Sequence, residues 1–196
     1  FAFYNVLLYG FVSFYCLHRG GVGSLALAGL AAGAATFSLA SGQLIWLVGM
    51  FSLCWQCLRW DGRPWFHLVA WLAMGALALA LYYSGVPPRY SEEGVLASAL
   101  QTPLHHLAWY MVSLGSALGF SAVPLALASG ALLLGLAACL LVSGIFKEFG
   151  PLHAYLLFLL GAALLVTLGR APYSGLDYAL APRYSVASQH VLLTCL

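Results

Sequence analysis

Long apolar runs separated by short polar breaks form the main pattern of this chain. Most runs approach the roughly 17–25 residues that a helix needs to cross a bilayer. None alternates apolar and polar residues as the roughly 10-residue strands of a membrane barrel do. We therefore predict an all-α, polytopic transmembrane helical bundle with seven to eight membrane segments. In chain order, the predicted segments are 1–17, 22–40, 44–58, 65–83, 104–120, 124–146, 152–169 and 186–196.

Composition agrees with this pattern. Hydrophobic residues make up 63% of the 196 residues and charged residues only 6%. A soluble domain typically has about 45–50% apolar and about 25% charged residues, so these few charges leave a soluble fold without a polar surface. The formal net charge of +2 is too small to attract nucleic acid, which excludes that class of partner.

The whole chain reads as one domain. No linker or change of composition divides it, so we predict a single transmembrane domain over residues 1–196. The sequence begins with Phe1 and stops at Leu196 inside an apolar run. We therefore expect it to be a fragment of a longer chain.

The charges of the polar breaks leave two topologies open. If every segment crosses the membrane, Lys and Arg divide 5:2 between the faces, and the positive-inside rule favours this arrangement. If 104–120 is instead re-entrant or interfacial, the division falls to 4:3, but the two longest polar breaks then share a face. The residues concerned are Arg19, Arg59, Arg63, Arg89, Lys147, Arg170 and Arg183.

Small residues and cysteines indicate packing more than chemistry. Two GxxxG pairs, Gly29 with Gly33 and Gly115 with Gly119, have the spacing that lets membrane helices approach closely. The chain has five cysteines, of which Cys54 and Cys57 form a single CxxC within an apolar run. Neither a zinc site nor a redox motif follows from one such pair. We interpret the cysteines as packing residues.

The richest polar stretch is 169–185, after the seventh apolar run. Arg170 stands where a helix would reach the lipid phosphates, and the planar guanidinium groups of Arg170 and Arg183 suit bidentate binding of phosphate. Tyr173 and Tyr184 are further candidates for substrate binding, and Asp177 is a candidate base. The structural alternative is that the arginines extend to lipid head groups while Asp177 neutralises one of them.

A second polar stretch, 84–103, supplies other candidates. Arg89 is a candidate for binding substrate, and Glu93, one of two adjacent glutamates, is a candidate acid or base. His106 follows at the start of the next apolar run, where a histidine can act as a general base. Adjacent glutamates are as often plain solvated surface. Common nucleotide-binding, zinc-protease and serine-hydrolase motifs are missing, so the sequence identifies neither a cofactor nor a metal site.

Several scattered elements carry a family resemblance. The chain resembles a group of largely uncharacterised bacterial polytopic membrane proteins that end in a Gly-Arg to Arg-Tyr signature, from which Pro182 departs. The resemblance implies the bacterial cytoplasmic (inner) membrane. It also implies a distant similarity to glycosyltransferases and polymerases that act on polyprenyl-phosphate-linked sugars. The elements are residues 37–46, Tyr82-Tyr83, Pro103, Ser113-Leu114-Gly115, Gly169-Arg170, Gly175, Ala179-Leu180 and Arg183-Tyr184.

Three functional hypotheses follow. The first is an enzyme of envelope polysaccharide assembly that binds a lipid-linked phosphate through Arg170 and Arg183. The second is a non-catalytic accessory or scaffolding subunit whose polar stretches contact other membrane proteins. The third is a transporter, which the lack of an evident internal repeat makes the weakest. Membrane lipids are partners in all three.

Overall fold

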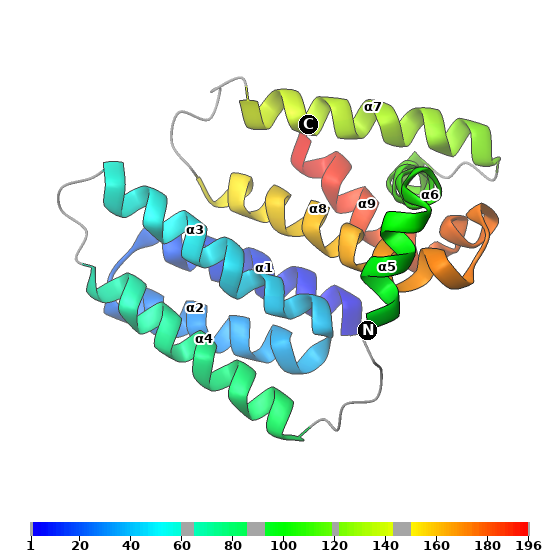
Figure 1. The fold of residues 1–196 in the computed structure, drawn as a ribbon. Coiled ribbons are helices and arrows are strands. Elements are labelled where there is room, and N and C mark those ends of the chain that lie inside the picture. The colour runs from blue at the N-terminus through cyan, green and yellow to red at the C-terminus, as the bar shows by residue number, and fades with distance from the viewer. Residues whose placement is uncertain (1, 60–64, 86–92, 119–121, 143–149, 196) are drawn as a thin grey trace. The chain divides into compact units, whose positions relative to one another are not determined.

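The structure is a computed structural model and describes residues 2–59, 65–85, 93–118, 122–142 and 150–195. Every regular element within these ranges is a helix (Figure 1), which confirms the predicted all-α fold class. The α-helices are α1 (Ala2–Arg19), α2 (Val22–Ser38), α3 (Leu44–Arg59), α4 (Phe66–Gly85), α5 (Glu93–Gln101), α6 (Pro103–Gly115), α7 (Val123–Val142), α8 (Pro151–Arg170) and α9 (Pro182–Cys195). Short 3-10 helices are η1 (Ala40–Gln43), η2 (Ser116–Leu118), η3 (Ala171–Tyr173) and η4 (Leu176–Leu180).

Four helical segments in the described ranges are long and apolar enough to cross a membrane. They are α3 with η1, α4, α7, and α8 with η3. This supports an integral membrane protein. The predicted total of seven to eight membrane segments stays a prediction, because α2 is apolar but shorter and α6 has only 13 residues.

Two boundaries differ from the predicted ones because polar stretches also form helices. Within the predicted polar stretch 84–103, the structure has the short helix α5. The last helix, predicted over 186–196, begins earlier at Pro182. Proline is favoured at the first helical position, since its missing N–H would have no partner there. Pro182 therefore explains why Arg183 and Tyr184 lie in the first turn of α9 and not in a loop.

The chain divides into two compact units, which we describe separately. The first comprises α1 to α4 and α8 as far as Phe158. Its helices α1 and α2 are joined by Gly20 and Gly21, whose φ angles of 76° and 89° favour glycine. The Ser13 hydroxyl donates to the carbonyl of Ala28 at 3.1 Å and ties the two helices together.

Two interlocked tryptophans join α3 to α4 in the first unit. The indole of Trp46 packs against Gly75, and the indole of Trp71 packs against Gly49. Trp71 Nε1 donates to the carbonyl of Trp46 at 3.0 Å, while Trp46 Nε1 donates to Thr36 Oγ1 of α2 at 2.9 Å. Each buried indole N–H thus has a partner, as its desolvation requires.

The second unit comprises α5 to α7, α8 from Leu159, and α9. Within it, α6 crosses α7 steeply: Figure 1 shows α6 nearly end-on while α7 runs across the view. Glycines allow this crossing. A Cβ at Gly115 would overlap the carbonyl oxygen of Ala126, and a Cβ at Gly130 would overlap that of Met111. The two backbones therefore meet without side chains between them.

The predicted glycine contacts are confirmed only in part. Gly29 meets the side chain of Met74, whereas a Cβ at Gly33 would meet nothing, so these two do not act as a pair. Gly115 is a true helix contact, but its counterpart is Gly130 of α7, and Gly119 lies outside the described residues. All five cysteines lie in the described ranges and are free, but Cys16 is buried while Cys139 is exposed, so their interpretation as packing residues stays a prediction.

Candidate functional site

The connection between α8 and α9 alternates buried alanines with exposed polar residues. Ala171 and Ala179 are almost fully buried, with 2% and 0% exposure. Arg170, Tyr173 and Asp177 are exposed, Tyr173 by 80%. The 3-10 helices η3 and η4 produce this alternation, because their backbone turns while the alanines face inward. Three predicted site residues therefore lie on the surface of a folded segment.

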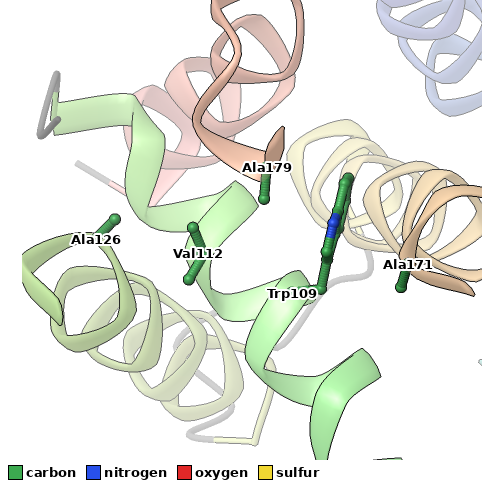
Figure 2. Packing of buried hydrophobic residues seen from close by; sticks show 5 residues of the cluster. All are labelled: Trp109, Val112, Ala126, Ala171 and Ala179. Carbon is green, nitrogen blue, oxygen red and sulfur yellow. The ribbon is translucent and has the colours of Figure 1, made fainter. Parts of the chain in front are cut away.

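Helix α6 holds this segment through a buried apolar cluster. Figure 2 shows Trp109 extending between Ala171 and Ala179, with Val112 on the side toward Ala126 of α7. Trp109 is fully buried, and it is the largest side chain of the cluster. Burying an aromatic side chain of this size against small residues contributes strongly to stability. The alanines are needed here because larger side chains would displace the indole.

Two hydrogen bonds fix the same segment to α6, and a third lies within the segment. His105 Nε2 donates to the carbonyl of Ala171 at 3.1 Å, which places a proton on Nε2. Trp109 Nε1 donates to Ser174 Oγ at 3.2 Å, and Ser174 Oγ donates to the carbonyl of Arg170 at 2.8 Å. The backbone on both sides of Tyr173 is thus held in place. This is the kind of pre-organisation that a binding site needs.

The charged groups on this surface are not paired with one another. Neither Arg170 nor Asp177 forms an ion pair or side-chain hydrogen bond with a described residue, although both are exposed. The interpretation that Asp177 neutralises Arg170 therefore has no support from the described residues. A guanidinium group at the end of α8 is left available to an anion outside the protein.

His106 lies beneath the surface and not on it. Its side chain is 6% exposed, and Nδ1 lies 2.9 Å from the carbonyl of Thr102. Since a carbonyl only accepts, Nδ1 carries a proton in this hydrogen bond. Among the described residues, Nε2 has no hydrogen-bond partner. Nε2 is therefore the ring nitrogen left to exchange a proton in the predicted role of His106.

The structure places the other predicted residues only as positions along the chain. Glu93 is the first residue of α5, and α5 contacts η3. Arg183 and Tyr184 follow Pro182 in the first turn of α9. Arg89 lies outside the described residues. The two polar stretches are therefore brought together at η3, although the side chains of these four residues lie outside the part of the chain that the structure describes.

The residues that anchor the segment were missed as site residues. The sequence indicates these anchoring residues in part, because a tryptophan inside an apolar run needs a hydrogen-bond partner for its indole N–H. The partner itself, Ser174, is 65 residues away along the chain, and no local pattern connects the two. The contact of His105 with Ala171 spans 66 residues, so no local pattern predicts it either.

Metal chemistry has no visible centre in the ranges that the structure describes, where no group of three or more His, Cys, Asp or Glu side chains comes together. The available chemistry is therefore that of one exposed guanidinium, one exposed carboxylate, exposed tyrosines and a buried imidazole. Comparisons with known protein families, curated proteins and solved structures find no match to this chain.

Proposed function

We propose that this chain is a bacterial inner-membrane protein that binds the phosphate or pyrophosphate of a lipid-linked sugar and transfers the sugar in envelope assembly. The observation that supports this most directly is the exposed guanidinium of Arg170 at the end of α8, which pairs with none of the described residues. The proposal has two parts. The first is recognition of a lipid phosphate, and the second is transfer of the sugar.

The position of Arg170 suits a lipid phosphate. Helix α8 has 20 residues, which corresponds to about 30 Å and so to the thickness of the hydrocarbon core. A residue at its end lies at the depth of the head groups. A guanidinium group there can bind two phosphate oxygens at once, and the exposed Tyr173 adds an aromatic ring at the same level.

The start of α9 adds a second anion-binding feature. The first turn of a helix presents free N–H groups and a positive dipole end, which favour phosphate. Arg183 belongs to this turn, so the proposal assigns it a supporting role in binding the phosphate, with Tyr184 beside it. Arg89 is assigned the same kind of role from the other polar stretch.

In the transfer, the incoming hydroxyl oxygen bonds to the anomeric carbon of the sugar, the bond from that carbon to the phosphate oxygen breaks, and the polyprenyl phosphate leaves with the electron pair. A protein group must accept the proton of the incoming hydroxyl. The proposal assigns this role to Asp177 or Glu93, with His106 as a third candidate. Asp177 is favoured because its carboxylate is exposed on the same segment as Arg170. General-base catalysis of this kind typically contributes about 10²–10⁴-fold. We expect Asp177→Asn to lower transfer by that order while leaving lipid binding intact.

Lipid binding is tested with purified protein in nanodiscs. We expect polyprenyl phosphate, but not the corresponding polyprenol, to raise the melting temperature. Arg170→Ala should weaken binding about 10-fold or more, since a hydrogen-bonded ion pair contributes about 1.5–3 kcal/mol. Arg183→Ala should weaken binding by a smaller factor. Arg19→Ala is the matched control, because Arg19 is likewise exposed at the end of a helix.

Two outcomes would remove the proposal. Equal binding of polyprenyl phosphate and polyprenol would exclude phosphate recognition. Unchanged transfer activity in folded Arg170→Ala and Arg183→Ala proteins would remove both arginines from the reaction. If either variant instead lost a stoichiometric membrane-protein partner, the chain would be an accessory subunit and not an enzyme.

A further inference from the structure

We infer that α6 is a membrane-embedded helix that does not cross the bilayer. As a result, helix α5 before it and the connection after α8 border one site, on one face, for a lipid phosphate. The ligand in this inference rests on the proposed function, whereas the placement of α6 does not. The second unit alone supplies the contacts that carry it.

Contacts at the two ends of α6 show which neighbouring helix ends lie at the same depth. Near its beginning, His105 donates to the carbonyl of Ala171, the residue directly after α8. At its end, Gly115 lies against the backbone of Ala126, in the first turn of α7. The beginning of α6 therefore lies at the end of α8, and the end of α6 lies at the beginning of α7.

The apolar cluster connects these helix ends directly. Trp109 and Val112, in the middle of α6, pack together with Ala126 of α7 and with Ala171. Val123 at the beginning of α7 and Val166 in the last turns of α8 pack against the same cluster. Since α7 and α8 are each long enough to cross and follow one another, these two ends share a membrane face.

A crossing α6 is incompatible with these contacts. If α6 crossed, its beginning and the start of α7 would lie on opposite faces. After α7 and α8 had both crossed, Ala171 would then lie on the face opposite to His105. The 3.1 Å hydrogen bond between these two residues requires a single face. The contradiction disappears when α6 does not cross.

The length of α6 and its outer surface agree with an embedded helix that does not cross. Its 13 residues correspond to about 20 Å, less than the roughly 30 Å of the hydrocarbon core. Its outward residues are apolar, with Leu104 79% and Leu107 45% exposed. A helix at the water surface would carry polar residues on that side. Helix α6 is therefore immersed in the acyl layer while it packs on its neighbours.

The consequence is that α5 and the connection after α8 lie on one membrane face. Helix α5, which precedes α6, contacts η3 (Ala171–Tyr173). The helix before α6 therefore lies beside the segment that follows Arg170. His106 is buried, and its Nε2 has no hydrogen-bond partner among the described residues. A phosphate bound by Arg170 would thus lie near α5.

Cysteine labelling with a membrane-impermeant maleimide tests the placement. Single cysteines replace Gln101, Ala122, Gly175 and Gly150 in a protein whose five native cysteines are changed to alanine. We expect the first three positions to react from one face of sealed vesicles and Gly150→Cys from the other. Labelling of all four in permeabilised vesicles is the control. Gln101→Cys and Ala122→Cys reacting from opposite faces would overturn the inference.

If the cysteine-free protein does not fold, a short epitope tag is inserted after Gln101, Ala122 or Gly175 of the full chain with its native cysteines. An antibody should reach the three tags from the same face of sealed vesicles, and a different face for any of the three would overturn the inference.

Protection of the same single-cysteine proteins from labelling by a bound lipid tests the shared site. Polyprenyl phosphate should slow labelling of Gln101→Cys and Gly175→Cys at least twofold, whereas polyprenol should slow neither. Protection of Gly175→Cys alone would overturn the shared site. If neither position is protected but Gln101, Ala122 and Gly175 lie on one face, the proposed function is contradicted and the placement of α6 is supported.

Discussion

At the residue scale, Trp109 determines how the α8–α9 connection is held. It is fully buried, it separates Ala171 from Ala179, and its Nε1 donates to Ser174. Within the described part of the chain, no other residue of the apolar cluster combines packing with a side-chain hydrogen bond to this segment. The surface that presents Arg170 and Tyr173 therefore depends on a side chain that an anion would never touch.

Two substitutions separate the packing of Trp109 from its hydrogen bond. Trp109→Ala should destabilise the protein by about 3–5 kcal/mol, the usual cost of removing a large buried aromatic side chain. Trp109→Phe keeps most of the apolar contact and should cost about 0.5–1.5 kcal/mol, because it removes the hydrogen bond to Ser174, whose hydroxyl still donates to the carbonyl of Arg170. Unfolding in mixed micelles measures both values. Trp65→Phe, at a site 63% exposed, is the control and should be close to neutral.

At the element scale, the crossing of α6 and α7 depends on glycines whose backbones touch. Gly115 and Gly130 each leave no room for a Cβ, because the opposing carbonyl oxygen already occupies that space. Helices without such contacts stay about 8–10 Å apart. The close crossing keeps α6 at the beginning of α7, and this placement supports the single-face site.

Gly130→Ala and Gly135→Ala compare a contact glycine with a free one in the same helix. Gly130→Ala should destabilise the protein by about 1–3 kcal/mol, since α6 must move away. A Cβ at Gly135 would meet nothing, so Gly135→Ala should be neutral or stabilise the helix by up to about 1 kcal/mol. Thermal unfolding in detergent measures the difference. Equal effects of the two substitutions would show that the crossing is not close.

At the element scale, the apolar runs predict the position of a helix but not whether it crosses the membrane. The segment predicted over 65–83 is α4, and the one over 124–146 matches α7, because uninterrupted apolar runs of that length have few other structures. The run 104–120 has a similar length and composition, so its pattern does not separate a crossing helix from an embedded one. That distinction comes from contacts between residues far apart in the chain, such as His105 with Ala171.

The candidate site was predictable to a similar extent. The charged stretch 169–185 was recognisable because arginines are rare in an apolar chain and gather at helix ends. Its 3-10 helices η3 and η4 were not, since their buried alanines pack against Trp109 of α6, which is far away along the chain. Whether Arg170 and Asp177 pair was likewise undetermined, because pairing depends on where each side chain of the folded connection points.

At the scale of the whole molecule, the remaining topological question concerns α1 and α2. Their 18 and 17 residues correspond to about 27 and 26 Å, close to the lower limit for crossing. The apolar helix α2 packs along α1 and contacts α4, which is itself long enough to cross. Membrane helices side by side share a hydrocarbon layer, so we expect α2 to cross as well.

Labelling at the two ends of α2 tests this crossing. Gly23→Cys, beside the glycine turn, and Ser38→Cys, at the last residue, should react with an impermeant maleimide from opposite faces of sealed vesicles. Both faces should react after permeabilisation. Reaction of both positions from the same face would make α1 and α2 an embedded hairpin, because two helices of this length joined by Gly20 and Gly21 can also enter and leave on one side. In that case the number of crossing helices would fall by two, and the faces assigned to the later polar stretches relative to one another would be unchanged.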